Sequence, residues 1–163
     1  MAKKCLPPCL MLAAVWACGC GPPQPKIPVG SVDQITMLTA PTPLNRDHVP
    51  GPDGLWADVF LFHVEKAKVV AVQSGGTLEM LLFEGPVAPE DISKAEPFHT
   101  WRFTAPALSP YRFRSKVGLG YRLWLPWGNK VPASASITLA ARYTPLKGRT
   151  LYSAPAVLAM RTK

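Results

Sequence analysis

Short segments in which apolar and polar residues alternate run through most of this chain, and they constrain its fold more than any other feature. Successive side chains of a β-strand point to opposite faces of a sheet, so alternation predicts strands with one buried face. We expect strands at residues 34–38, 55–62, 69–72, 77–84, 98–104, 121–125, 137–143 and 151–160. The 163 residues include 19 Pro and 12 Gly, which exclude a bundle of long helices because Pro interrupts helix interiors. The sequence therefore predicts an all-β protein: a single antiparallel β-sandwich of about seven to eight strands, with one or two short helical turns in its loops.

The clearest alternation lies near the C-terminus. One set of residues there is expected to face the core: Ile137, Leu139, Ala141 and Tyr143. The hairpin at residues 136–160 resembles the terminal strand pair of immunoglobulin-like and transthyretin-like domains. Pro155 lies within the last expected strand, which predicts an edge position or a bulge. We expect one helical turn at residues 89–95 and another that begins at Ser109-Pro110, with Ser109 as its cap.

The first residues predict a secretory signal. Lys3 and Lys4 precede an apolar run at residues 5–17, which is shorter than the roughly 20 apolar residues of a membrane-spanning helix. A basic start followed by a short apolar run is typical of a signal peptide. The alternative is a buried helix of the mature domain, which Pro7 and Pro8 disfavour.

The residues after this run, Val15-Trp16-Ala17-Cys18-Gly19-Cys20-Gly21, resemble the lipobox of bacterial lipoprotein signal peptides. The resemblance implies cleavage before Cys20, a diacylglyceryl group on its thiol and acylation of the new amino terminus, with Cys18 as the alternative lipidation site. The other interpretation of the four Cys is a thiolate metal site, which needs further ligands in a folded frame. No Cys follows Cys20, which disfavours a thiolate site. We expect no metal and no cofactor.

These features divide the chain into a signal peptide (1–19), a lipidated Cys with a Pro-rich tether (20–30) and a β-sandwich domain (31–163). Several acyl chains hold a protein on a membrane far more firmly than one chain does. The tether favours extended polyproline II at about 3.1 Å per residue, so it reaches roughly 30 Å. The predicted location is the bacterial cell envelope, with the domain lipid-anchored to a membrane and outside the cytoplasm. The expected partners are membrane lipid and either an envelope protein or an anionic envelope component, without nucleic acid.

Charge is distributed unevenly along the chain. Residues 21–96 contain ten Asp or Glu and five Lys or Arg, whereas residues 97–163 contain eleven Lys or Arg and no acid. One interpretation is that acidic and basic strands lie side by side, so that their fields largely cancel. The other is a basic patch that holds anionic lipid, acidic glycan or an acidic protein face. Its members would be Arg112, Arg114, Lys116, Lys130, Lys147 and Arg149.

The segment from Tyr111 to Lys116 interleaves aromatic and basic residues, and the basic segment from Tyr111 to Lys130 is the expected binding face. Such interleaving would suit single-stranded nucleic acid, but a secreted lipoprotein is not expected to meet it. The candidate binding residues are Tyr111, Arg112, Arg114, Lys116, Trp127 and Lys130. Trp124 is a further candidate contact that we expect in the core instead. The alternative for residues 111–116 is a loop whose aromatic side chains anchor in the core while its cations stay solvated.

No catalytic motif stands out. His63-Val64-Glu65 matches the start of a zinc deaminase pattern, but the later Pro-Cys-x-x-Cys is missing. There is no Gly-x-Ser-x-Gly elbow and no phosphate-binding loop. The polar loop at residues 45–54 contains Asp47, His48 and Asp53, which makes a secreted hydrolase the alternative to a non-enzymatic protein. A weak calcium site in this loop is conceivable, although its spacing is not that of an EF-hand.

Part of this region resembles a known family. Pro43-Leu44-Asn45, then Asp47, and Gly54 leading into Val59-Phe60-Leu61-Phe62 are similar to the small outer-membrane lipoprotein of type VI secretion systems. The resemblance covers residues 43–62 and implies a transthyretin-like sandwich that docks a larger membrane partner through loops. It implies no individual binding residue. The sequence therefore favours a non-enzymatic lipoprotein with a binding or docking role, and a structural spacer without a specific ligand is a further alternative.

Overall fold

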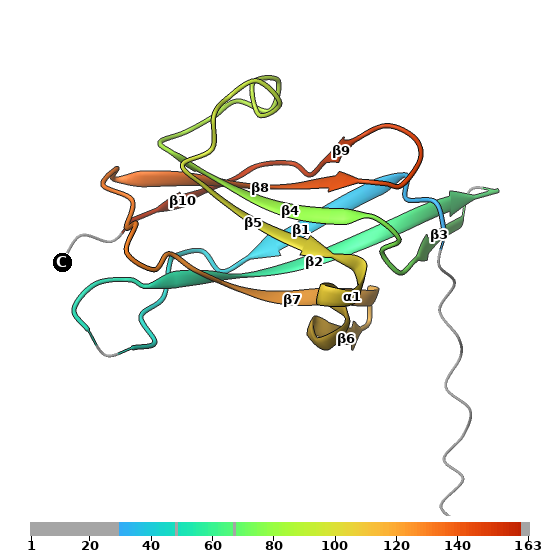
Figure 1. Ribbon diagram of the computed structural model, residues 1–163, viewed down its shortest axis with the longest axis horizontal. Coiled ribbons are helices and arrows are strands. Elements are labelled where there is room, and N and C mark those ends of the chain that lie inside the picture. The colour runs from blue at the N-terminus through green and yellow to red at the C-terminus, as the bar shows by residue number, and fades with distance from the viewer. Residues whose placement is uncertain (1–29, 48, 67, 161–163) are drawn as a thin grey trace, which may run out of the picture.

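Two antiparallel sheets pack face to face and enclose the core between them (Figure 1). The computed structural model describes residues 30–47, 49–66 and 68–160. The expected signal peptide and most of the tether, including Cys18 and Cys20, lie outside the described residues. The prediction of an all-β sandwich with short helical turns is confirmed.

The first sheet has the strand order β1–β2–β7–β6, with β3 paired to the last residues of β2. Its strands are β1 (Gln34–Thr39), β2 (Gly54–Glu65), β3 (Lys68–Ala71), β6 (Arg112–Ser115) and β7 (Gly118–Pro126). The second sheet has the order β10–β8–β4–β5, with β9 also paired to β8. Its strands are β4 (Thr77–Glu84), β5 (His99–Thr104), β8 (Ser136–Thr144), β9 (Leu151–Tyr152) and β10 (Ala156–Ala159).

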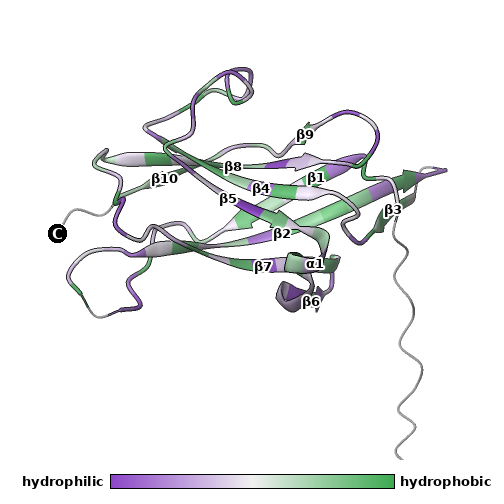
Figure 2. Cartoon of the chain, in the orientation of Figure 1, coloured by the Kyte–Doolittle hydropathy of each residue, from purple (hydrophilic) through white to green (hydrophobic). Residues whose placement is uncertain are grey.

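The core forms where the alternating residues of the two sheets meet. Leu55, Ala57, Val59 and Leu61 of β2 are fully buried. The predicted inward set of β8, from Ile137 to Tyr143, is likewise buried. Figure 2 shows the apolar stretches along β2, β4 and β7 and the polar stretches in the loops at the two ends. The alternation thus places one face of each strand against the other sheet, where burial of apolar surface stabilises the fold.

The last predicted strand is interrupted, as Pro155 led us to expect. β9 and β10 both pair with β8 but are separated by residues 153–155. The Ser153 amide donates to the Ala141 carbonyl at 2.9 Å, and the Ser153 hydroxyl accepts a hydrogen bond from the Ala141 amide at 2.9 Å. The side chain of Ser153 therefore satisfies a backbone donor of β8 that the interrupted strand leaves unpaired.

The strand β6 was not predicted. It forms a hairpin with β7, in which Phe113 lies opposite Gly120. A Cβ atom at Gly120 would lie 2.7 Å from the Phe60 ring and 2.8 Å from the Phe113 ring. Only glycine therefore lets the two aromatic rings cross over β7, and this contact holds β6 on the sheet. The interpretation of residues 111–116 as a loop was wrong.

The helical turns lie close to their expected places. α1 (Ala105–Leu108) continues into the 3-10 helix η1 (Ser109–Tyr111), which contains Pro110 near its start. Residues 89–95 form hydrogen-bonded turns in which the Ala95 amide donates to the Asp91 carbonyl at 2.8 Å. This loop buries Ile92 on the outer face of the second sheet. Within the described part of the chain, no helix has the length and hydrophobicity that spanning a bilayer requires.

Candidate functional site

The outer face of the first sheet carries an unusual number of aromatic side chains. The alternation that buries Leu55 and Val59 turns Trp56, Phe60 and Phe62 away from the core. Phe60 and Phe62 are nevertheless buried and stack with their ring centroids 6.3 Å apart. Phe113 covers Phe60 edge-on at 5.6 Å. This aromatic cover explains why both faces of β2 are apolar, although no second sheet lies on the outer side.

Trp56 and Trp124 form the end of this aromatic row. They lie opposite each other in the register of β2 and β7, with ring centroids 5.4 Å apart. The guanidinium carbon of Arg46 lies 4.9 Å from the Trp124 ring and 5.4 Å from the Trp56 ring. A Cβ atom at Gly54 would lie 2.8 Å from the Trp124 ring, so glycine at this position allows the indole to lie across β2. Both indoles stay half-buried.

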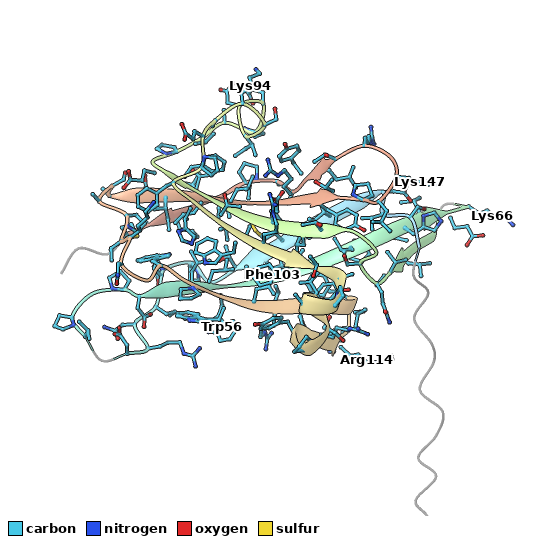
Figure 3. All side chains as sticks on the ribbon, viewed as in Figure 1. Trp56, Lys66, Lys94, Phe103, Arg114 and Lys147 are labelled. Carbon is cyan, nitrogen blue, oxygen red and sulfur yellow. The ribbon has the colours of Figure 1, made fainter. Side chains whose placement is uncertain are left out.

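A groove of about 490 Å³ opens beside Trp56 on this face. Its lining comes from the end of β1, from β2 and from β7: Leu38, Thr39, Ala40, Trp56, Asp58 and Arg122. We call it the Trp56 groove. Leu38 is 54% exposed, although it belongs to a strand. Figure 3 shows Trp56 on the outer side of the first sheet.

One wall of the Trp56 groove is an ion pair. Arg122 donates from Nε to Asp58 Oδ1 at 2.9 Å and from Nη2 to Asp58 Oδ2 at 2.8 Å. This bidentate hydrogen bonding raises the pKa of Arg122. The Arg122 guanidinium also lies 4.7 Å from the Phe113 ring. Because each charge satisfies the other, the wall needs no ligand charge, and an apolar group fits the groove best.

A second cluster of ion pairs connects an acid from the first half of the sequence to two arginines from the second half. Glu79 of β4 is 4% exposed and accepts hydrogen bonds from Arg102 at 2.9 Å and from Arg142 at 2.6 Å. Burial by itself would raise the pKa of Glu79, and the hydrogen bonds from the two arginines outweigh it and lower the pKa. With the Asp58–Arg122 pair, this cluster favours the interpretation that acidic and basic strands lie side by side.

The proposed basic patch is divided in the structure. Arg112, Arg114 and Lys116 lie on β6 and in the turn before β7, whereas Lys130 follows the other end of β7. Residues 118 and 126 are eight positions apart, or about 27 Å along an antiparallel strand. Lys147 and Arg149 lie in the loop between β8 and β9 of the second sheet. The six cations therefore do not form one continuous patch.

The burial of the aromatic candidates in residues 111–130 also differs from expectation. Trp127 is 2% exposed and belongs to the core, so its assignment as a contact residue was wrong. Its amide donates to the Asp53 carbonyl at 3.0 Å, which folds the chain back over the end of the sandwich. Trp124, which we expected in the core, is half-buried on the outer face. Tyr111 is 41% exposed and contacts Phe103 edge-on at 5.9 Å.

The structure brings together a Ser, a His and an Asp that sequence analysis did not combine. Ser31 Oγ lies 3.0 Å and Asp33 Oδ2 lies 2.5 Å from the same nitrogen, His63 Nδ1. A catalytic triad places the hydroxyl and the carboxylate on opposite nitrogens of the imidazole, so this arrangement is not a triad. The hydrogen bonds from the Val64 amide and from His63 lower the pKa of Asp33, and they fasten the start of the sandwich to β2.

The residues of the alternative hydrolase site have structural partners. Asp53 Oδ2 accepts hydrogen bonds from the Arg46 amide at 2.9 Å and from the Asp47 amide at 3.0 Å. Asp47 Oδ1 accepts one from the Val49 amide at 2.9 Å. His48 lies outside the described residues. Among the residues that the structure covers, no group of three or more His, Cys, Asp or Glu is arranged to hold a metal ion.

Comparisons of the chain with protein-family models, with curated proteins and with solved structures find no match.

Proposed function

We propose that this protein is a membrane-anchored, non-enzymatic lipoprotein of the bacterial cell envelope, whose sandwich lies outside the cytoplasm and docks a protein partner. The anchor is proposed from the lipobox-like residues that end at Cys20. The docking role is supported by one observation above the others, the Trp56 groove on the outer face of the first sheet.

The lining of the Trp56 groove suits an apolar side chain of another protein. Leu38, Ala40 and Trp56 provide apolar walls, and Asp58 and Arg122 neutralise each other. Binding hot spots are enriched in Trp and Arg, and they usually lie in pockets that exclude water once the partner is bound. Leu38 is 54% exposed beside Trp56, so the two side chains form an apolar surface that a partner can cover.

The anchor is tested by mass spectrometry of the mature amino terminus. We expect a chain that begins at Cys20 and carries acyl groups, and a Cys20→Ala variant that is neither cleaved there nor acylated. A Cys18→Ala variant should be processed normally. A soluble product cleaved at another position would overturn the proposed anchor.

Docking is tested by photo-crosslinking in cells, with a photoreactive amino acid in place of Leu38. The matched control is Val157, which has nearly the same exposure (56% against 54% for Leu38) but lies on β10 of the other sheet. We expect a discrete crosslinked protein with the probe at position 38, none at position 157, and loss of the product when Trp56→Ala is added. Equal labelling at both positions, or none at position 38, would favour the structural spacer.

A further inference from the structure

Several loops meet at the end of the sandwich where the described chain begins. β1 and β7 start at this end, and β2 and β8 finish there. A groove of about 430 Å³ joins residues 30–33 to residues 145–149 of the β8–β9 loop. The β6–β7 turn is adjacent, because a Cβ atom at Gly118 would lie 2.7 Å from Ala71 of β3. Figure 1 shows this end, at the right, beside β3. We call it the tether end.

Large apolar side chains lie in water at the tether end. Leu146 is 86% exposed, the highest value among the exposed large hydrophobic residues of the described chain. Val117, in the β6–β7 turn, is 56% exposed, and Val69 of β3 is 59% exposed. Leu146 and Val117 occupy loop positions, where the core does not require an apolar residue. Both lie in loops at the same end of the sandwich, which points to an extended surface that covers them.

A cation accompanies each of these loops. Lys147 follows Leu146, Lys116 precedes Val117, and Lys66 lies in the turn before β3. Arg149 lies in the same loop as Leu146. Figure 3 shows Lys66 and Lys147 together at this end. An apolar tip flanked by Lys and Arg is the pattern of a segment that lies in a membrane interface, because the apolar group enters the acyl boundary while the cations meet lipid phosphates.

Basic and acidic residues concentrate at opposite ends of the long axis of the sandwich. Among the described residues, the tether end carries two acids, Asp33 and Glu65, and Asp33 is hydrogen-bonded to His63 and to the Val64 amide. Acids predominate at the opposite end and in the loop between β4 and β5: Asp47, Asp53, Glu84, Glu90, Asp91 and Glu96. An anionic surface attracts the tether end and repels the other end.

We infer that the tether end docks on an anionic lipid bilayer. Leu146 and Val117 enter the interface, and Lys66, Lys116, Lys147 and Arg149 contact the lipid phosphates. The inference rests on the proposed lipid anchor, because an anchor at Cys20 would keep the weakly attractive surface near the membrane at high effective concentration. Docking in this orientation holds the Trp56 groove away from the bilayer by about 30 Å, the length of β2 between Trp56 and Glu65.

The test uses the full chain as recovered from the membrane fraction, reconstituted into vesicles of phosphatidylcholine with or without phosphatidylglycerol. No Cys follows Cys20, so Leu146→Cys places a single thiol in the sandwich for an environment-sensitive fluorophore. Val131→Cys is the control: it is 53% exposed, less than Leu146, and lies in the loop that follows the opposite end of β7. We expect the label at position 146 to shift to shorter emission wavelength and to be several-fold less accessible to an aqueous quencher than the label at position 131. This difference should require phosphatidylglycerol.

Variants with reversed charge provide the second part of the test. We expect Lys116→Glu with Lys147→Glu to abolish the protection at position 146, whereas Lys94→Glu, in the β4–β5 loop, should leave it unchanged. Flotation of the vesicles separates the two hypotheses: protein that does not float with the vesicles contradicts the anchor. Protein that floats but carries equally quenched labels at positions 146 and 131 overturns the docking inference and leaves the anchor in place. Equal protection of the label at position 146 in vesicles with and without phosphatidylglycerol would also overturn the docking inference.

Discussion

Trp56 and Trp124 lie directly opposite each other on β2 and β7, on the face of the sheet that points away from the core, with ring centroids 5.4 Å apart. Arg46 lies over both rings. The pair therefore belongs to the surface of the sandwich, and Trp127, which lies one residue beyond β7, belongs to its core.

The two tryptophans near the end of β7 should differ in their effect on stability. Trp124→Ala removes a tilted ring pair and a cation–π contact, and we expect a loss of about 1–2 kcal/mol in the free energy of unfolding. Trp127→Ala leaves a cavity in the core and should cost about 3–5 kcal/mol. Urea unfolding of both variants measures the order, and a larger loss for Trp124→Ala would contradict the assignment of the two faces.

Gly120 should not tolerate a methyl group. In Gly120→Ala the new Cβ atom would lie within 3 Å of the Phe60 and Phe113 rings, so one ring must leave its position. We expect a loss of about 1–3 kcal/mol, measured by thermal or urea unfolding. Adding Phe113→Ala should recover part of the loss at position 120, because it makes room for the methyl group. A purely additive double variant would show that the ring contact is not the cause.

Acid should weaken the fold partly through Glu79. The pKa of Glu79 in the folded protein lies below its ordinary value of 4.5, because the hydrogen bonds from Arg142 and Arg102 outweigh the effect of burial. The stabilisation is therefore fully present above pH 4.5 and is lost as the pH falls through the lower folded pKa. Glu79→Gln should cost about 1–3 kcal/mol at pH 7 and should flatten the decline of stability between about pH 5 and pH 3. Urea unfolding across this range measures both effects, and an unchanged slope would contradict the role of Glu79.

The Ser153 hydroxyl should protect one amide of β8. Ser153→Ala removes the acceptor of the Ala141 N–H group, which is buried and has no carbonyl partner to replace it. We expect a loss of about 1–2 kcal/mol in stability and faster hydrogen exchange at the Ala141 amide than at its neighbours in β8. Exchange at Ala141 that matches the wild-type rate would show that another group accepts this hydrogen.

The alternation of residues predicted most of the strands because each has one face in the core. β6 was missed because its four residues bury none of their side chains fully, and its place in the sheet comes from backbone pairing with β7, in which Phe113 lies opposite Gly120. Trp124 was predicted in the core and Trp127 on the surface, which is the wrong way round, although the alternation along β7 already separates the two residues. Tyr121, Leu123 and Leu125 face the core, so period two places residue 127 inside and residue 124 outside.

The candidate site was less accessible to sequence analysis. The Trp56 groove combines the end of β1 with β2 and β7, which are brought together only by the sheet order. The contact of Ser31 and Asp33 with His63 depends in the same way on the pairing of β1 with β2. The basic patch was expected because cations concentrate in the second half of the sequence. The sandwich instead pairs three other arginines of that half with Asp58 and Glu79, and it places Lys130 at the opposite end of β7 from Arg112, Arg114 and Lys116.

The break between β9 and β10 limits how other molecules can add to the sheet. A long, straight strand at the border of a sheet is a template onto which another chain can add its own strand and begin a fibre. Here the border beside β8 consists of a two-residue and a four-residue strand, and Pro155 between them has no N–H group to offer. For a protein anchored as proposed above, neighbouring molecules on one membrane surface would find little to extend at this border, so the interruption disfavours strand addition there.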